Sequence, residues 1–134
     1  MTISALNLKI LYQINYKNLS ISKSQIMQDF FVLNELGYKR NGYFVDFGAT
    51  DGMEHSNSYL LEKEYNWNGI LCEPSKGWHK SLKLNRPNAI IDHRCVWTES
   101  GKKIKFKECD INTLSTIEGF ECLDQYSENR KSSK

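Results

Sequence analysis

Residues 43–52 constrain the fold of this chain more than any other segment. An apolar run over residues 43–45 ends at an acid, Asp46, and continues into a loop that contains Gly48 and Gly52. A strand that ends at a carboxylate and turns through glycines is how open α/β sheets form a crevice of nucleotide size. The sequence therefore predicts an α/β fold with a binding site at the carboxyl end of this first strand.

The spacing of the glycines separates two classes of nucleotide site. Dinucleotide-binding folds carry G-x-G-x-x-G, which places a pyrophosphate on a helix N-terminus. Here the pattern is D-x-G-x-x-x-G, and Thr50 stands where a nicotinamide-dependent oxidoreductase would have its second glycine. The carboxylate of Asp46 suits a ligand with positive charge and no phosphate, such as S-adenosylmethionine. The alternative interpretation of Asp46 is an acid that caps a helix in an ordinary turn.

A second acid, Glu73, ends the next predicted strand (residues 69–72) and lies 21 residues after Gly52. Nucleotide folds of this topology place the acid that accepts the ribose hydroxyls at such a strand end. Pro74 follows and stops the strand. We expect the carboxylates of Asp46 and Glu73 to face one crevice, and the competing interpretation of Glu73 is a solvated strand terminus.

The adenine ring is expected between the ends of the second and third strands. Arg94, Cys95 and Val96 offer backbone groups for the base edge and apolar area for its face. Asp92 is an alternative acceptor for the exocyclic amine. Asn57, near the start of the helix after the glycine loop, either reaches the methionine end of the ligand or caps the helix, and capping is favoured.

Hydrophobic periodicity predicts the other elements. Helices are expected over residues 3–14, over about a dozen residues from a cap at Ser24 to a stop at Gly37, over 55–65, and from a cap at Ser75 to a break at 86–87; strands are expected over 43–47, 69–72 and 89–96, with an extended run over 103–108. The residues expected to face the core include Ile26, Phe30, Leu33, Leu36, Tyr59, Leu60, Trp78, Leu82 and Leu84. Alternating strands and helices with right-handed crossovers form one half of a doubly wound sheet.

Composition excludes several classes of function. The chain has 134 residues, and its 18 basic and 16 acidic residues do not form a run basic enough to require nucleic acid or a membrane. The four cysteines form no C-x-x-C pair, so no metal site is expected and the thiols are expected to be free, in a reducing compartment. Without a signal peptide or an apolar stretch of spanning length, a cytoplasmic location is predicted.

No catalytic residue can be assigned from the sequence. The histidines His55, His79 and His93 have no partner at metal-ligand or triad spacing and are expected at the surface or half-buried. Asp51 is the acid nearest to the predicted site, and an exposed loop position is its favoured interpretation. The identity of a base that would act on an acceptor therefore stays open.

Together these segments resemble the FkbM-type family of S-adenosylmethionine-dependent methyltransferases. The matching motifs are S-Q-x-x-Q-D-x-F-V-L at residues 24–33, G-Y-F-V-D-F-G-A-T-D-G at 42–52, S-N-S-Y-L-L-E at 56–62, W-N-G-I-L-C-E-P at 67–74, R-C-V-W at 94–97 and L-S-T-I at 114–117. The resemblance covers about residues 24–118.

The resemblance implies a partial, mostly parallel Rossmann-like sheet of class I methyltransferase type, preceded by N-terminal helices. It also implies O-methylation of a hydroxyl on a sugar or secondary metabolite, with S-adenosylmethionine as the cofactor. The expected cofactor site comprises Asp46, Gly48, Thr50, Gly52, Asn57, Glu73, Pro74, Arg94 and Cys95, with Gln25, Gln28 and Asp29 near the pocket or its lid.

Members of that family continue into a fourth core strand with a D-x-E-G-x-E-like motif, which this sequence lacks. We therefore expect a helical extension over residues 1–23, a truncated methyltransferase domain without its C-terminal half over 24–120, and a polar tail over 121–134. Two interpretations stay open. A second copy or another chain covers the exposed sheet edge, or the chain is a non-catalytic remnant or partner subunit that binds cofactor.

Overall fold

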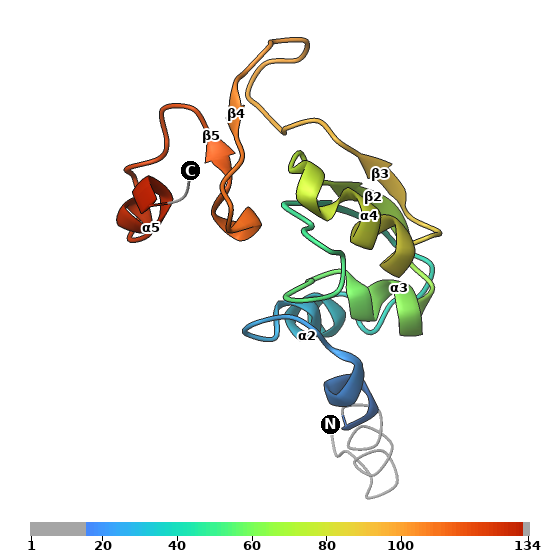
Figure 1. Cartoon of the computed structure of the whole chain (residues 1–134). Coiled ribbons are helices and arrows are strands. Elements are labelled where there is room, and N and C mark those ends of the chain that lie inside the picture. Colours follow the sequence, from blue (N-terminus) through green and yellow to red (C-terminus); the bar gives the residue numbers. More distant parts are fainter. Residues whose placement is uncertain (1–15, 133–134) are drawn as a thin grey trace, which may run out of the picture. The chain divides into compact units, whose positions relative to one another are not determined.

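A computed structural model describes residues 16–132, and side chains up to residue 130 (Figure 1). The helix predicted over residues 3–14 lies outside this range. The chain divides into two compact units. The described part of the first comprises residues 16–44 and 53–68, and that of the second comprises residues 45–52 and 69–132.

The first unit is built from helices that end in well-defined turns. Residues 16–21 are helical, followed by α2 (Gln28–Glu35) and α3 (Tyr59–Tyr65). Gly37 ends α2 with φ +57°, and the Tyr38 N–H donates to the Leu33 carbonyl at 2.7 Å. Because glycine adopts this left-handed conformation without a Cβ penalty, the predicted helix stop at Gly37 is confirmed.

The predicted start of α2 at Ser24 is wrong. The hydroxyls of Ser22 and Ser24 each donate to the carboxylate of the fully buried Asp29 at 2.6 Å. The Ser24 hydroxyl therefore donates a hydrogen bond to a buried carboxylate instead of capping the first turn of the helix. The helix α2 begins four residues later. Ile26 consequently lies before the helix and is 79% exposed, whereas Leu33 is fully buried as expected.

A tryptophan and a glycine pack tightly in the first unit. The Trp67 indole N–H donates to the Lys39 carbonyl at 2.8 Å. A Cβ on Gly42 would lie 2.5 Å from the Trp67 ring, so only glycine fits there. The helix α3 begins at residue 59, not 55, and buries Leu60 and Leu61.

The sheet has the strand order β1-β2-β3 and is parallel, as predicted. Its strands are β1 (Tyr43–Phe47), β2 (Asn68–Cys72) and β3 (Ile90–Asp92), with Cys72 opposite Asp92 in the register. This mixed α/β arrangement is consistent with part of a Rossmann-like fold. The strand β1 lies at an edge of the described sheet.

The third strand is much shorter than the predicted span of residues 89–96. It ends at Asp92, whose carboxylate accepts the backbone N–H of Arg94 at 2.9 Å. This side-chain bond turns the chain within two residues, because aspartate offers the backbone an alternative to the strand ladder.

The helix α4 (Lys76–Asn85) connects β2 to β3, and Ser75 is its N-cap residue, as predicted. The Ser75 side chain makes no capping bond. Instead, carboxylates take the first amides of the helix: Glu73 accepts from the Ser75 N–H at 2.9 Å and Glu108 from the Lys76 N–H at 2.6 Å. Acids at a helix N-terminus satisfy these amides and suit the helix dipole.

Only part of the predicted inner face of α4 is buried. Leu82 is fully buried, but Leu84 is 72% exposed, so its assignment to the core was wrong. Two residues along a helix turn the side chain by more than half a revolution. The helix therefore packs on the side that carries Leu82.

A small antiparallel ribbon follows the sheet. It consists of β4 (Phe106–Lys107) and β5 (Thr116–Ile117), with η1 (Asn112–Leu114) between them and α5 (Ser127–Ser132) after them. Only two residues of the extended run predicted over residues 103–108 are paired in this way. The polar tail predicted over residues 121–134 contains α5.

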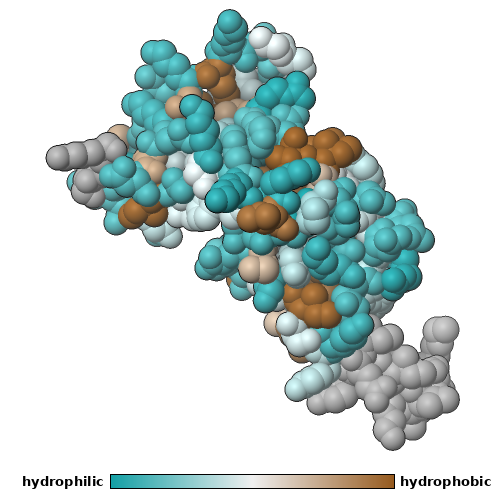
Figure 2. Space-filling view, turned by 45° about the vertical axis from the view of Figure 1, so that its right-hand side comes forward, coloured by the Kyte–Doolittle hydropathy of each residue, from teal (hydrophilic) through white to brown (hydrophobic). Residues whose placement is uncertain are grey.

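The surface of the described residues is mainly hydrophilic with separate apolar patches (Figure 2). Tyr43, Val45 and Phe47 on β1 are each more than half exposed, while Phe44 between them is buried. No helix within residues 16–132 is both long enough and apolar enough to cross a membrane.

Candidate functional site

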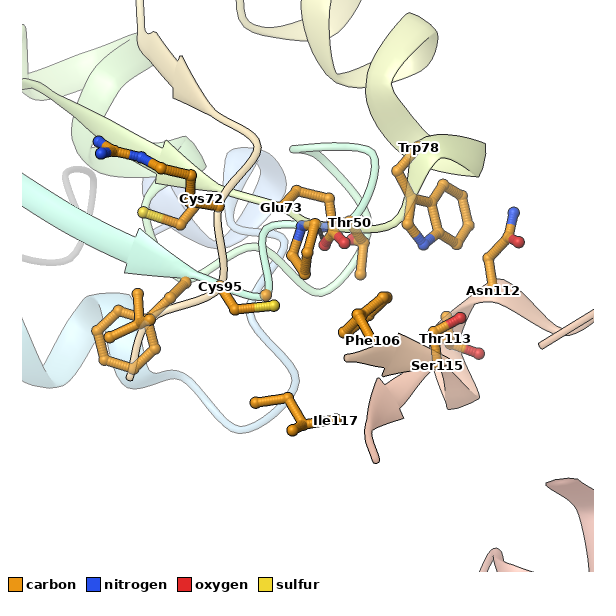
Figure 3. Close-up of a pocket in the computed structure, with 15 residues that line it drawn as sticks. Thr50, Cys72, Glu73, Trp78, Cys95, Phe106, Asn112, Thr113, Ser115 and Ile117 are labelled. Carbon is orange, nitrogen blue, oxygen red and sulfur yellow. Dashed lines mark hydrogen bonds between the residues drawn. The ribbon is translucent and has the colours of Figure 1, made fainter. Parts of the chain in front are cut away.

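A cavity of about 290 Å³ opens at the carboxyl ends of the three parallel strands (Figure 3). Phe47 and Gly48 contribute from the end of β1, Cys72 and Glu73 from the end of β2, and the chain after β3 supplies a third side. Open α/β sheets bind their ligands at this edge. The volume is at the lower end of the range for small-molecule sites.

The remaining wall comes from elements that the sequence did not assign to the site. Trp78 lies in the first turns of α4, and Phe106 and Ile117 come from the ribbon β4–β5. Figure 3 shows Glu73 and Thr50 next to each other near the centre of the cavity. The cavity thus combines a polar side at the strand ends with aromatic and aliphatic walls.

Six of the nine residues predicted to bind a cofactor line this cavity: Gly48, Thr50, Glu73, Pro74, Arg94 and Cys95. The other three, Asp46, Gly52 and Asn57, do not line it. Of the two carboxylates expected to face one crevice, only that of Glu73 is at the cavity. Asp46 is half-buried and alternates along β1 with Phe47, which does line the cavity.

Glu73 links the glycine loop to α4. Its side chain is held by two backbone amides, with Thr50 N–H donating to Oε2 at 2.8 Å and Ser75 N–H donating to Oε1 at 2.9 Å. Only 4% of the residue is exposed. Each carboxylate oxygen carries two acceptor sites, so each keeps one for a ligand hydroxyl.

Gly48 and Gly52 serve different purposes although both have φ +77°. A Cβ on Gly48 would meet nothing within 4 Å, whereas one on Gly52 would lie 2.6 Å from side-chain carbons of both Leu82 and Arg86. Gly48 therefore leaves space beside the cavity. Gly52 lets α4 approach the loop closely and is a packing residue in this structure.

Arg86 is the main structural residue that the sequence analysis missed. It is fully buried, and its Nη1 donates to the Gly52 carbonyl at 2.8 Å. The neighbouring Asn85 donates its side-chain amide to the Asp51 carbonyl at 2.9 Å. The end of α4 thus holds the glycine loop through two backbone carbonyls. The sequence signal for this role of Arg86 was its position directly before a helix-breaking proline.

An ion pair lies beside the cavity after β3. The side-chain hydrogen bonds from Arg94, followed by its backbone N–H, lower the pKa of Asp92 to about 2. The Arg94 Nε donates to Asp92 Oδ1 at 2.9 Å, although the Arg94 side chain is 87% exposed. Asp92 is therefore already engaged, and an adenine amine would compete with Arg94 for it.

The two thiols at this cavity are in an environment that favours the neutral form. Burial raises the pKa of Cys72, and the carboxylates of Asp92 and Asp46 add to the increase, while the cation of Arg94 opposes it. Burial also raises the pKa of Cys95, with Glu73 adding to the effect. Desolvation and nearby negative charge both disfavour a thiolate, so neither thiol is an activated nucleophile.

Two histidines stack close to the cavity. The ring of His79 lies 3.6 Å from that of His93 between centroids, and His79 Nε2 is 3.0 Å from the Glu73 carbonyl oxygen. His79 is half-buried and His93 exposed, which agrees with the positions expected for them at or near the surface. Among the described residues, no group of three or more histidine, cysteine, aspartate or glutamate side chains could hold a metal ion.

No family model, curated protein or solved structure matches the chain. The cavity and the residues that line it are therefore the basis for assigning a function to the chain. Chemically, the site offers a partly engaged carboxylate, open space where a side chain on Gly48 would be, and a wall of aromatic and aliphatic side chains.

Proposed function

We propose that this cavity binds S-adenosylmethionine and that the chain is a class I methyltransferase of FkbM type, acting on a hydroxyl of a sugar or secondary metabolite. One observation carries the proposal. Six residues chosen from the sequence alone for this ligand come from three separate segments, and all six line a single cavity at the edge where such sheets bind nucleotides.

The lining residues fit the adenosine part of the ligand. In the proposal, the free acceptor sites of Glu73 receive the two ribose hydroxyls, while Thr50 and Ser75 keep the carboxylate in place. Gly48 allows close approach of the ligand to the backbone, since no atom occupies the space where its side chain would be. Phe106 and Val96 supply apolar area for the base.

When bound, S-adenosylmethionine supplies a methyl group activated by its sulfonium. The contribution of the protein is to hold the ligand and the acceptor oxygen in line and to exclude water. Glu73 fixes the ribose of the ligand, and Trp78 and Phe106 shield the ligand from solvent. A base would have to receive the proton of the acceptor, and we assign none.

The second candidate is a chain that binds the cofactor without transferring the methyl group. It is favoured by the state of the acids beside the cavity. In the proposal the remaining acceptor sites of Glu73 are taken by the ribose, and the Asp92 carboxylate is bound by Arg94, so neither acid is placed to act on an acceptor hydroxyl.

Isothermal titration with S-adenosylhomocysteine tests the proposal directly. We expect micromolar binding by the full chain, and we expect Glu73→Gln to weaken it about tenfold, because a charged acceptor is lost. The matched control is Glu99→Gln, an exposed glutamate paired with Lys102, which should bind normally. Equal melting temperatures for the two variants would show that Glu73→Gln still folds.

Absence of binding at millimolar ligand would overturn the proposed site. Binding that is insensitive to Glu73→Gln would place the ligand elsewhere. Asp46→Asn provides a further comparison, since the cavity geometry predicts a smaller effect for it than for Glu73→Gln. Binding without methyl transfer to any of a panel of sugar hydroxyls would favour the second candidate.

One of the two interpretations that the sequence leaves open is that a second copy or another chain covers the sheet edge. That edge carries Tyr43, Val45 and Phe47, each more than half exposed. Light scattering after size exclusion over a range of concentrations would test self-association. A monomer at all concentrations would exclude a second copy as the cover.

A further inference from the structure

The ribbon β4–β5 and the turn η1 form one side of the proposed cofactor cavity. The side chains that line the cavity from this part of the chain are Phe106, Asn112, Thr113, Ser115 and Ile117. The opposite face of the ribbon lines a second cavity, of about 540 Å³. None of the residues from 103 to 130 is buried. The hydrophobic effect therefore does little to fix the ribbon in place.

Glu108 joins the ribbon to the first turn of α4. Its Oε1 accepts the Lys76 N–H at 2.6 Å and the Ser75 hydroxyl at 3.4 Å. The first amides of a helix have no partner within the helix, and a negative charge there suits the helix dipole. Glu108 itself is exposed and follows β4 directly. Its carboxylate therefore fastens the ribbon to the side of the cavity that α4 forms.

Ser75 connects this fastening to the proposed ligand site. Its N–H donates to Glu73 Oε1 at 2.9 Å, and its hydroxyl donates to Glu108. Only 1% of Ser75 is exposed. In the proposed function, Glu73 receives the ribose hydroxyls of the ligand. One buried serine therefore bonds both the carboxylate that receives the ligand and the carboxylate that holds the ribbon.

Asn112 and Gly77 form a second contact, between η1 and α4. A Cβ on Gly77 would overlap the side-chain amide of Asn112, so the amide packs where a side chain would otherwise be. Gly77 is an exposed position within α4, and glycine is less favourable than alanine inside a helix. The close approach of η1 gives a physical reason for glycine at this position.

The chain that leads from the sheet to the ribbon is an irregular loop. Residues 93–105 contain no helix or strand, and Gly101 within them has φ +77° with nothing within 4 Å of the position of a Cβ. Loop residues of this kind absorb the backbone changes of a hinge. The ribbon is thus attached to β3 through a loop and is held on α4 by the contacts of Glu108 and Asn112.

We propose that the ribbon is a lid over the cofactor cavity and that Glu108 is a positioning residue that latches this lid to α4. The inference rests on the proposed function, since the ligand in question is S-adenosylmethionine. With the latch bonded, Phe106 and Ile117 lie against the ligand that Glu73 holds. With the latch released, the ligand enters and leaves past the ribbon.

Stopped-flow binding of S-adenosylhomocysteine to the full chain tests the lid. Tryptophan fluorescence can follow the reaction, because Trp78 lines the cavity. Glu108→Ala removes both bonds to α4, so the association and dissociation rates should both rise by about 3- to 10-fold. The equilibrium affinity should change less than either rate, because the latch bonds are the same with and without ligand. Glu108→Gln keeps a neutral acceptor and should give a smaller rise.

A matched control and a second variant sharpen the test. Glu118→Ala removes an exposed carboxylate that pairs with Lys105 on the same ribbon, and it should leave both rates unchanged. Gly77→Ala should not harm the fold of α4, because alanine is the better helix former. Its Cβ displaces the Asn112 amide, so both rates should rise by about 2- to 3-fold at an unchanged melting temperature.

Unchanged rates in Glu108→Ala would overturn the lid. Faster dissociation with unchanged association would also overturn it, since that pattern describes a fixed wall that has lost a contact. An equal rise in Glu118→Ala would overturn the latch, because the effect would then be a general one of charge. These three results leave the proposed cofactor site standing, whereas absence of binding by the unmodified chain would overturn the proposed function and the lid with it.

Discussion

The segment that carries β2, α4 and β3 (residues 68–92) and the segment that carries the ribbon and α5 (residues 103–130) are held together by different forces. Leu71 and Leu82 in the first are fully buried, and Arg86 is buried with them. In the second segment no described residue from 103 to 130 is buried. The hydrophobic effect therefore stabilises the first segment, and it contributes little to the second.

Charged and polar contacts, rather than the hydrophobic effect, stabilise the ribbon segment (residues 103–130). Lys105 pairs with Glu118, Lys107 with Glu121, and Arg130 with Asp124. Exposed ion pairs are each worth little and are screened by salt. The wall of the proposed cofactor cavity that the ribbon forms should therefore be more sensitive to salt than the wall formed by the strand ends and α4.

The largest expected effect is on the buried side of α4. Leu82→Ala should lower the free energy of unfolding by about 2–5 kcal/mol, because it removes a fully buried side chain and leaves a cavity. Leu84→Ala, two residues away on the exposed side, should change it by less than about 0.5 kcal/mol. Urea unfolding measures both. Similar losses for the two variants would contradict the packing described for α4.

The next effect concerns the two glycines of the loop. Gly48→Ala and Gly52→Ala share the strain of φ +77°, but only the second also places a Cβ against Leu82 and Arg86. Gly52→Ala should therefore be less stable than Gly48→Ala by about 1–3 kcal/mol. Thermal unfolding of the pair isolates the clash. Gly48→Ala should in addition weaken binding of S-adenosylhomocysteine, since Gly48 lines the cavity.

A smaller effect should appear only in the ribbon segment. Arg130→Gln removes two hydrogen bonds to backbone carbonyls and an ion pair. Hydrogen exchange over residues 109–125 should speed up about tenfold, equivalent to about 1.4 kcal/mol, with no change over residues 68–92. Moderate salt should reproduce part of this change in the unmodified chain. Faster exchange in both segments would show that they are not independent.

The smallest effect is the pH dependence from Asp92. Because its folded-state pKa is about 2 and its ordinary value 3.8, its ionised form stabilises the fold above about pH 4, and this contribution is lost as the pH falls toward 2. Asp92→Asn should flatten the stability profile in that window. The change should stay below about 1 kcal/mol and shrink in salt, since Arg94 is exposed. If the stability of Asp92→Asn and that of the unmodified chain fall equally as the pH is lowered from about 4 to about 2, the ion pair of Asp92 with Arg94 contributes nothing.

Much of the sheet could be predicted from the sequence because its strands are short apolar runs bounded by strong breakers. β1 and β2 fall where they were expected, and Gly37 ends α2 as predicted. The errors occur where a polar side chain competes with the backbone. Ser24 bonds to Asp29 instead of capping α2, and Asp92 ends β3 early by binding the Arg94 N–H.

Part of the site could also be predicted, because β1 and β2 fall where they were expected. Residues at strand ends could be placed, because parallel strands bring their carboxyl ends to one edge. The wall formed by Phe106 and Ile117 could not, since it depends on the pairing of two strands of only two residues each. Arg86 was read as a helix breaker, because nothing local shows that its guanidinium reaches the Gly52 carbonyl.

The ribbon β4–β5 has two faces, and each belongs to a different cavity. Phe106 and Ile117, which are paired in the register, line the first cavity, and their neighbours Lys107 and Thr116 line the second. The ribbon is therefore a partition between two chambers. Thermodynamic linkage then makes the two cavities reciprocal: if a ligand in the second cavity changes the affinity of the first for its own ligand, occupancy of the first changes the affinity of the second by the same factor.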